Sequence, residues 1–80
     1  MQKRTFELWV GRYSDETKLS IKVRADKILP IGGRDVKLIG LKPTAMLAVS
    51  RLFKDKVPKV MFGGVAANCV EFIEEEDVQQ

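Results

Sequence analysis

Two aromatic residues and three cations near the N-terminus are the combination in this sequence that best suggests a binding chemistry. Trp9 and Tyr13 are followed along the chain by Lys18, Lys22 and Arg24. Proteins hold single-stranded nucleic acid by stacking bases on aromatic rings while Lys and Arg contact the phosphates. Trp, Tyr and Arg also dominate the energetics of protein–protein interfaces. These five residues therefore predict a binding surface, with either a protein or a nucleic acid as its target.

The side chains that most often catalyse reactions are scarce. The sequence contains no histidine, which is the usual general base and the commonest metal ligand. Without it, the serine and threonine hydroxyls have no evident base to activate them. The single cysteine, Cys69, excludes an internal disulfide and has no basic partner in the sequence, so we expect it to behave as a small apolar residue. We therefore predict a protein that is not an enzyme and that has no catalytic residues and no cofactor.

Two glycine pairs and an acidic run resemble ligand-binding motifs but lack the required spacing. Gly32-Gly33 and Gly63-Gly64 have neither the further glycines nor the Lys-Ser/Thr ending of a phosphate-binding loop, so both predict turns. Residues 74–77 are consecutive acids, whose side chains diverge and do not provide the spaced ligands of a calcium loop. The run predicts a solvated tail, and no metal site is expected.

The net charge of +3 conceals a division of charge along the chain. Residues 1–60 hold all 14 Lys and Arg and carry +8, whereas residues 61–80 contain no base and carry −5. This asymmetry favours a polyanionic partner, but it is equally compatible with the acidic end lying across the basic body. The basic residues are scattered, while a dedicated nucleic-acid module more often has a denser stripe of them.

Length and composition predict one small domain over residues 1–80, with residues 74–80 as a frayed acidic tail. The sequence is 45% hydrophobic and 31% charged, which is ordinary for a globular protein. No apolar run approaches the ~20 residues of a membrane span, and the N-terminus has no apolar segment of the signal-peptide type. We expect a cytoplasmic protein without membrane contact.

The element that organises the chain is an amphipathic helix predicted over residues 41–56. Pro43 suits a helix entry, Thr44 offers a capping hydroxyl, and Pro58 prevents continuation. One face of this helix is apolar, which predicts that it covers one face of a sheet. That face is formed by Ala45, Ala48, Val49, Leu52 and Phe53.

The strongest strand signal comes before this helix. Residues 18–26 alternate between polar and apolar side chains without exception, which predicts a strand half buried in an antiparallel sheet. Residues 6–13 are rich in aromatic and β-branched residues and predict a hairpin partner for it. If Leu8 and its alternate neighbours face the helix, Trp9 lies on the other face with Lys22 and Arg24. The alternative is that Trp9 packs into the core beside the helix.

The remaining segments complete the sheet. Residues 36–41 and 59–62 predict two further strands, while residues 27–31 are apolar but less regular. Residues 65–76 fit a helix or a strand. We favour the strand, because the run of acids that follows would be repelled by the negative C-terminal end of a helix.

These patterns predict an α+β fold with a small antiparallel or mixed sheet of four to five strands and one amphipathic helix packed on one face. The order is β-β-β-α-β-β, which resembles at most the β-grasp arrangement in topology alone. We expect a small non-enzymatic protein that inhibits, adapts or regulates a larger protein partner through the exposed sheet face. Nucleic-acid binding by the same face is the alternative, and homodimer formation through an edge strand is a plausible addition. The predicted binding residues are Trp9, Tyr13, Lys18, Lys22 and Arg24.

Overall fold

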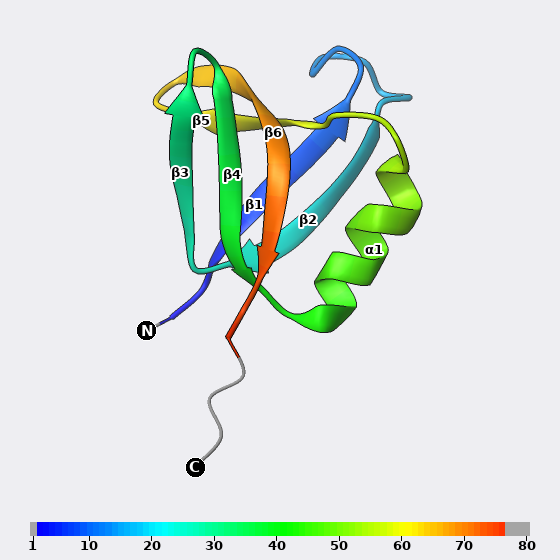
Figure 1. Cartoon of the computed structure of the whole chain (residues 1–80). Helices are drawn as coiled ribbons and strands as arrows, with labels where there is room; N and C mark the ends of the chain where they lie inside the picture. The colour runs from blue at the N-terminus through cyan, green and yellow to red at the C-terminus, as the bar shows by residue number, and fades with distance from the viewer. Residues whose placement is uncertain (1, 77–80) are drawn as a thin grey trace.

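Six strands and one helix follow one another in the computed structural model, which describes residues 2–76 (Figure 1). The elements are β1 (Arg4–Val10), β2 (Leu19–Ala25), β3 (Lys27–Gly32), β4 (Asp35–Leu41), α1 (Pro43–Phe53), β5 (Lys59–Phe62) and β6 (Val65–Glu74). Figure 1 shows a strongly curled sheet with α1 lying beside β2. The predicted α+β class, with one helix packed on a mixed sheet, is confirmed.

The sheet consists of three hairpins joined side by side. Its strand order is β2-β1-β5-β6-β4-β3, so β2 and β3 are the two edges. Neighbouring strands are antiparallel except β4 and β6, which are parallel. The curl brings the end of β2 close to β4, where the backbone N–H of Asp26 donates to the carbonyl oxygen of Ile39 at 2.8 Å.

The number of strands before the helix differs from the sequence-based prediction. The sheet has six strands rather than four to five, and the predicted order with its β-grasp-like arrangement is not confirmed. The additional strand is β3, because the irregular apolar residues after Asp26 pair with β4 across the turn at Gly33. Pro30 is tolerated there because β3 is an edge strand, where a missing N–H interrupts no second ladder.

The ambiguous C-terminal segment is a strand, as favoured from the sequence. β6 pairs with β5 on one side and with β4 on the other. Glu74 is its last residue, and the backbone N–H of Glu75 donates to the carbonyl oxygen of Leu41 at 2.8 Å. The predicted tail therefore does not begin at residue 74, and residues 77–80 lie outside the described residues.

The apolar face of α1 packs on the sheet as its spacing predicts. Val49 and Phe53 belong to the core, and Ala45 and Leu52 pack against it. The helix begins at Pro43, so Thr44 already lies within the first turn and makes no capping hydrogen bond. A membrane-crossing helix is not found among residues 2–76, since α1 has 11 residues.

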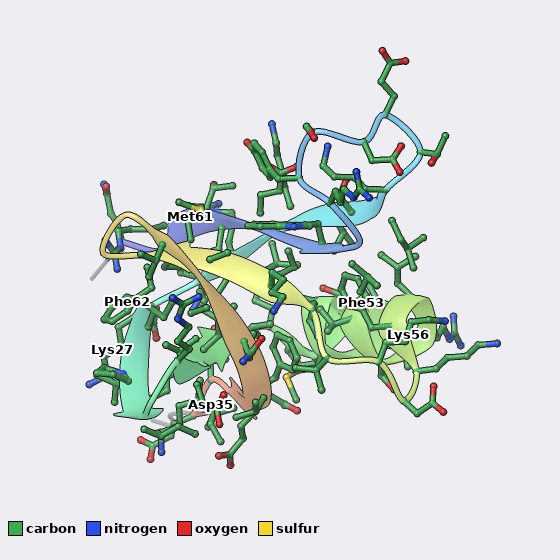
Figure 2. All side chains as sticks on the ribbon, turned by 90° about the horizontal axis from the view of Figure 1, so that it is seen from above. Lys27, Asp35, Phe53, Lys56, Met61 and Phe62 are labelled. Carbon is green, nitrogen blue, oxygen red and sulfur yellow. The ribbon has the colours of Figure 1, made fainter. Side chains whose placement is uncertain are left out.

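The core lies between α1 and the inner face of the curled sheet. Consecutive residues of a strand alternate between the two faces. In β5, for example, Phe62 packs against the core while Met61 projects to the opposite side (Figure 2). The buried cluster contains Leu8, Val23, Ala25, Val36, Leu38, Leu41, Val49, Phe53, Val60, Ala67 and Cys69.

The residue that ends α1 has a backbone conformation that favours glycine. Lys54 has φ +52° and ψ −113°, and it is the non-glycine residue with positive φ among residues 2–76. Such a conformation costs a residue with a Cβ atom about 1–3 kcal/mol. We expect Lys54→Gly to raise the free energy of unfolding by about 1 kcal/mol, measured by urea denaturation. Lys56→Gly, which removes the same exposed side chain two residues later, should not stabilise the protein; equal effects of the two substitutions would contradict the strain at Lys54.

Candidate functional site

The β1–β2 hairpin places the predicted binding residues of its two strands on one sheet face. Glu7 lies opposite Lys22, and Trp9 lies opposite Ser20. The adjacent pair, Leu8 and Ile21, faces α1 and the core. The face assignment made from the alternating pattern is therefore confirmed by the strand register.

Trp9 is on the predicted face but is not exposed. Only 2% of its surface is accessible, and it is outside the core cluster that contacts α1. β1 lies between β2 and β5, so Trp9 has Ser20 on one side and Lys59 on the other. The ring of Tyr13 also packs against it edge-on, with the ring centroids 4.9 Å apart. Trp9 therefore offers no exposed platform, and it does not pack in the core beside the helix either. It is buried on the outer face, where Tyr13 packs against the indole.

Tyr13 lies in the β1–β2 loop rather than on a strand. It is 57% exposed, and the Nζ atom of Lys18 lies 5.2 Å from its ring centroid. Its hydroxyl donates a long hydrogen bond of 3.5 Å to Glu7 Oε1. The loop is braced by Asp15, whose carboxylate accepts the backbone N–H and the hydroxyl of Thr17, and these bonds lower the pKa of Asp15. Lys18 thus lies over the ring of Tyr13 in the loop, apart from Lys22 and Arg24 on β2.

Lys22 and Arg24 line a groove between β2 and the beginning of α1. The groove has a volume of about 400 Å³. Residues 21 to 24 alternate between the two sheet faces, yet all four line the groove, so it runs along the open edge of β2. Its complete lining is Lys3, Ile21, Lys22, Val23, Arg24, Lys42, Thr44, Ala45 and Ala48. We call this cavity the β2–α1 groove.

The lining of the β2–α1 groove is basic and contains no acid. Among residues 2–76 both ion pairs are made by Lys3, so Lys22, Arg24 and Lys42 are not paired with any described carboxylate. The N-terminal turn of α1 adds positive potential, because it has no acidic residue and no side-chain cap. The groove is therefore suited to an anionic group.

Lys3 differs from the other cations of the groove because its charge is already compensated. Its Nζ atom lies 2.9 Å from Glu75 Oε1 and 3.0 Å from Asp26 Oδ1, and it donates to the carbonyl oxygen of Gly40 at 2.8 Å. The hydrogen bonds to Glu75 and then to Asp26 raise the pKa of Lys3. Lys3 therefore joins the N-terminal segment to the C-terminal segment through its ion pair with Glu75, and its charge is not available to a ligand.

A second polar chain crosses the middle of the outer sheet face. Lys59 Nζ donates to Asn68 Oδ1 at 2.7 Å, and Asn68 Nδ2 donates to Asp35 Oδ1 at 3.2 Å. These residues come from β5, β6 and β4, which are adjacent strands. A cation and a carboxylate are joined through the amide, so this part of the face has little net charge.

Cys69 and the acidic residues were the remaining candidates for a nucleophile and for metal ligands. Cys69 is buried, and desolvation raises the pKa of its thiol to about 12, so the reactive thiolate does not form near neutral pH. No group of three or more Cys, Asp or Glu side chains within residues 2–76 is arranged to hold a metal ion.

The structure brings Lys22 and Arg24 together in the groove, whereas Trp9, Tyr13 and Lys18 lie outside its lining. The position of Lys42 in the sequence gave no sign that it lines the same groove as Lys22. A weak signal was present in the helix, where Ala45 and Ala48 interrupt an otherwise bulky apolar face and leave room against β2.

Comparison with known protein families, with curated proteins and with solved structures found no match for this chain.

Proposed function

We propose that this chain is a small non-enzymatic binding protein of the cytoplasm that inhibits, adapts or regulates a larger protein partner. The observation that carries the proposal is the β2–α1 groove, which has three cations without described carboxylate partners: Lys22 and Arg24 on the edge strand β2, and Lys42 at the beginning of α1. Such a surface favours an acidic segment of a partner, because complementary charge raises the association rate and selects among partners.

The buried Trp9 weakens the nucleic-acid alternative more than it weakens the protein-partner proposal. Single-stranded nucleic acid is bound by stacking on exposed rings, and here Trp9 is buried while Tyr13 contacts Lys18. Phosphate contacts from Lys22 and Arg24 are still available to a nucleic acid. A protein partner needs no stacking platform, since the groove also provides an apolar floor.

Reversing the charge of the groove tests the proposal. We expect Lys22→Glu with Arg24→Glu to abolish capture of the partner from cell extract, because both reversals face the partner's acids. Lys27→Glu with Arg34→Glu is the matched control, since it makes the same change in net charge at exposed positions outside the groove (Lys27 in Figure 2). Partners that bind both variants equally well would contradict the role of the groove.

Nuclease treatment and salt separate the two classes of partner. A protein partner should remain bound after nuclease treatment of the extract. Binding driven by phosphates should instead weaken steeply between about 50 and 200 mM salt. A shift of short DNA or RNA in electrophoresis at low salt, lost on this salt increase and in the groove variant, would favour the nucleic-acid alternative.

A further inference from the structure

We infer that the β2 edge receives an extended acidic segment of the partner as an added strand in the β2–α1 groove. This inference rests on the proposed function and specifies how the partner is held. In strand addition, the main-chain hydrogen bonds provide affinity, and the alternate side chains of the added segment provide specificity. The edge, the groove and the charges each support one part of it.

β2 is the more regular of the two sheet edges. Its register with β1 continues without a shift from Leu19 opposite Val10 to Ala25 opposite Arg4. Among residues 2–76 no strand pairs with its other side, although β4 comes close to the end of β2. A regular edge presents a row of N–H and C=O groups that another strand can pair with. The opposite edge, β3, contains Pro30 and has a register shift after it, so it is a poorer template.

The groove has room for the inward side chains of an added strand. On the core side it is lined by Ile21 and Val23 of β2 and by two small residues of α1, Ala45 and Ala48. Because Ala has no side chain beyond Cβ, the helix leaves the space of about 400 Å³ next to the strand. Every second residue of the added segment would place an apolar side chain there.

The remaining side chains of an added strand would lie on the outer face, beside Lys22 and Arg24. Directly opposed residues of paired strands have Cβ atoms about 4.5–5.5 Å apart, so acids at these positions would reach both cations. Lys42 and the uncapped first turn of α1 favour a further carboxylate near the helix. The groove therefore selects a segment that alternates between apolar and acidic residues.

A second copy of this chain is a poor occupant of the same edge. Antiparallel pairing of β2 with itself about Lys22 would place the two Lys22 side chains opposite each other. Pairing about Val23 would instead place Lys22 opposite Arg24. Like charges directly opposed on a sheet are destabilising, whereas a segment with acids at these positions is complementary. The charges of β2 therefore select a partner strand rather than a homodimer.

The test uses ¹⁵N-labelled protein and a short, end-blocked peptide of alternating Val and Glu. We expect amide shifts and slowed hydrogen exchange confined to β2 and to the first turns of α1. Ala48→Leu should weaken binding about tenfold by filling the groove, whereas Ser50→Leu, which introduces the same side chain at an exposed helix position, should not. Lys22→Glu with Arg24→Glu should weaken binding at least about tenfold.

Three peptide controls isolate the strand-addition step. A Val–Lys peptide should not bind, because it opposes the cations of the groove. A Val–Glu peptide with N-methyl groups on alternate residues should lose binding in one of its two methylation patterns, because that pattern removes the donors that face β2. Equal binding of all these peptides, shifts outside β2 and α1, or a concentration-dependent dimer in sedimentation would overturn the inference.

Failure of the inference and failure of the proposed function give different results. In the first case the charge reversal at Lys22 and Arg24 abolishes capture of the partner, but Ala48→Leu does not affect capture and N-methylation does not affect peptide binding. The proposed function then holds, and strand addition is wrong. If the groove charge reversal leaves capture unchanged, the proposed function itself fails.

Discussion

Alanine in place of Phe53 is expected to cause the largest loss in the free energy of unfolding among the substitutions considered. Phe53, labelled in Figure 2, is 2% exposed and is the largest side chain of the buried core cluster. Replacing a buried Phe by Ala costs about 3–5 kcal/mol, because apolar contacts are lost and a cavity remains. A chain of 80 residues is expected to have roughly 4–12 kcal/mol in total, so Phe53→Ala should remove at least about a quarter of the free energy of unfolding.

Urea denaturation followed by circular dichroism and by the fluorescence of Trp9 measures this loss. The protein has a single Trp, which is buried, so its emission should shift to longer wavelength as Trp9 becomes exposed. Leu47→Ala is the matched control, because Leu47 lies on α1 but is 51% exposed. A loss of less than about 0.5 kcal/mol is expected there. Similar losses in the two variants would show that α1 does not pack through Phe53.

Alanine in place of Gly40 is expected to be the second most damaging substitution among those considered. Gly40 has φ +91°, a conformation that residues with a Cβ atom rarely adopt, at a cost of about 1–3 kcal/mol. A Cβ atom there would also collide with the side chain of Asp26. Asp26 and the carbonyl oxygen of Gly40 both bind Lys3, so the collision disturbs the contact that joins the chain ends. We expect Gly40→Ala to cost at least about 2 kcal/mol.

Gly33→Ala is the control that separates the collision from the backbone cost. Gly33 also has positive φ, at +57°, but an added Cβ atom would meet nothing within 4 Å. Its loss should therefore be the smaller one, about 1–2 kcal/mol. Both losses are measured by urea denaturation. If Gly33→Ala and Gly40→Ala cost the same, the close approach of Asp26 would carry no penalty.

The local patterns of the chain were sufficient to place most elements. The strict alternation of residues 18–26 predicted β2 and assigned Lys22 and Arg24 to one face, and the register confirms that assignment. The helical spacing of Val49 and Phe53 predicted the buried face of α1. These predictions held because the backbone geometry alone makes side chains return to the same face every 2 residues in a strand and every 3.6 residues in a helix.

Residues 27–32 show why local pattern was not sufficient for the strand count. Their sequence is irregular and contains Pro30, which argues against a central strand. They form β3 because a hairpin turn returns the chain along it as β4, and the edge position removes the penalty of the proline. An edge position is a property of the whole sheet and cannot be deduced from six residues.

By itself the sequence determined which residues share a face: Trp9 with Lys22 and Arg24 on the outer side of the hairpin, and Leu8 on the inner side. Only the tertiary structure decided which of them are accessible. The placement of β5 beside β1 helps to bury Trp9, while the absence of a described strand beside β2 opens the groove. The physical reason is that alternation fixes the direction of a side chain, whereas exposure depends on neighbours that are distant along the chain.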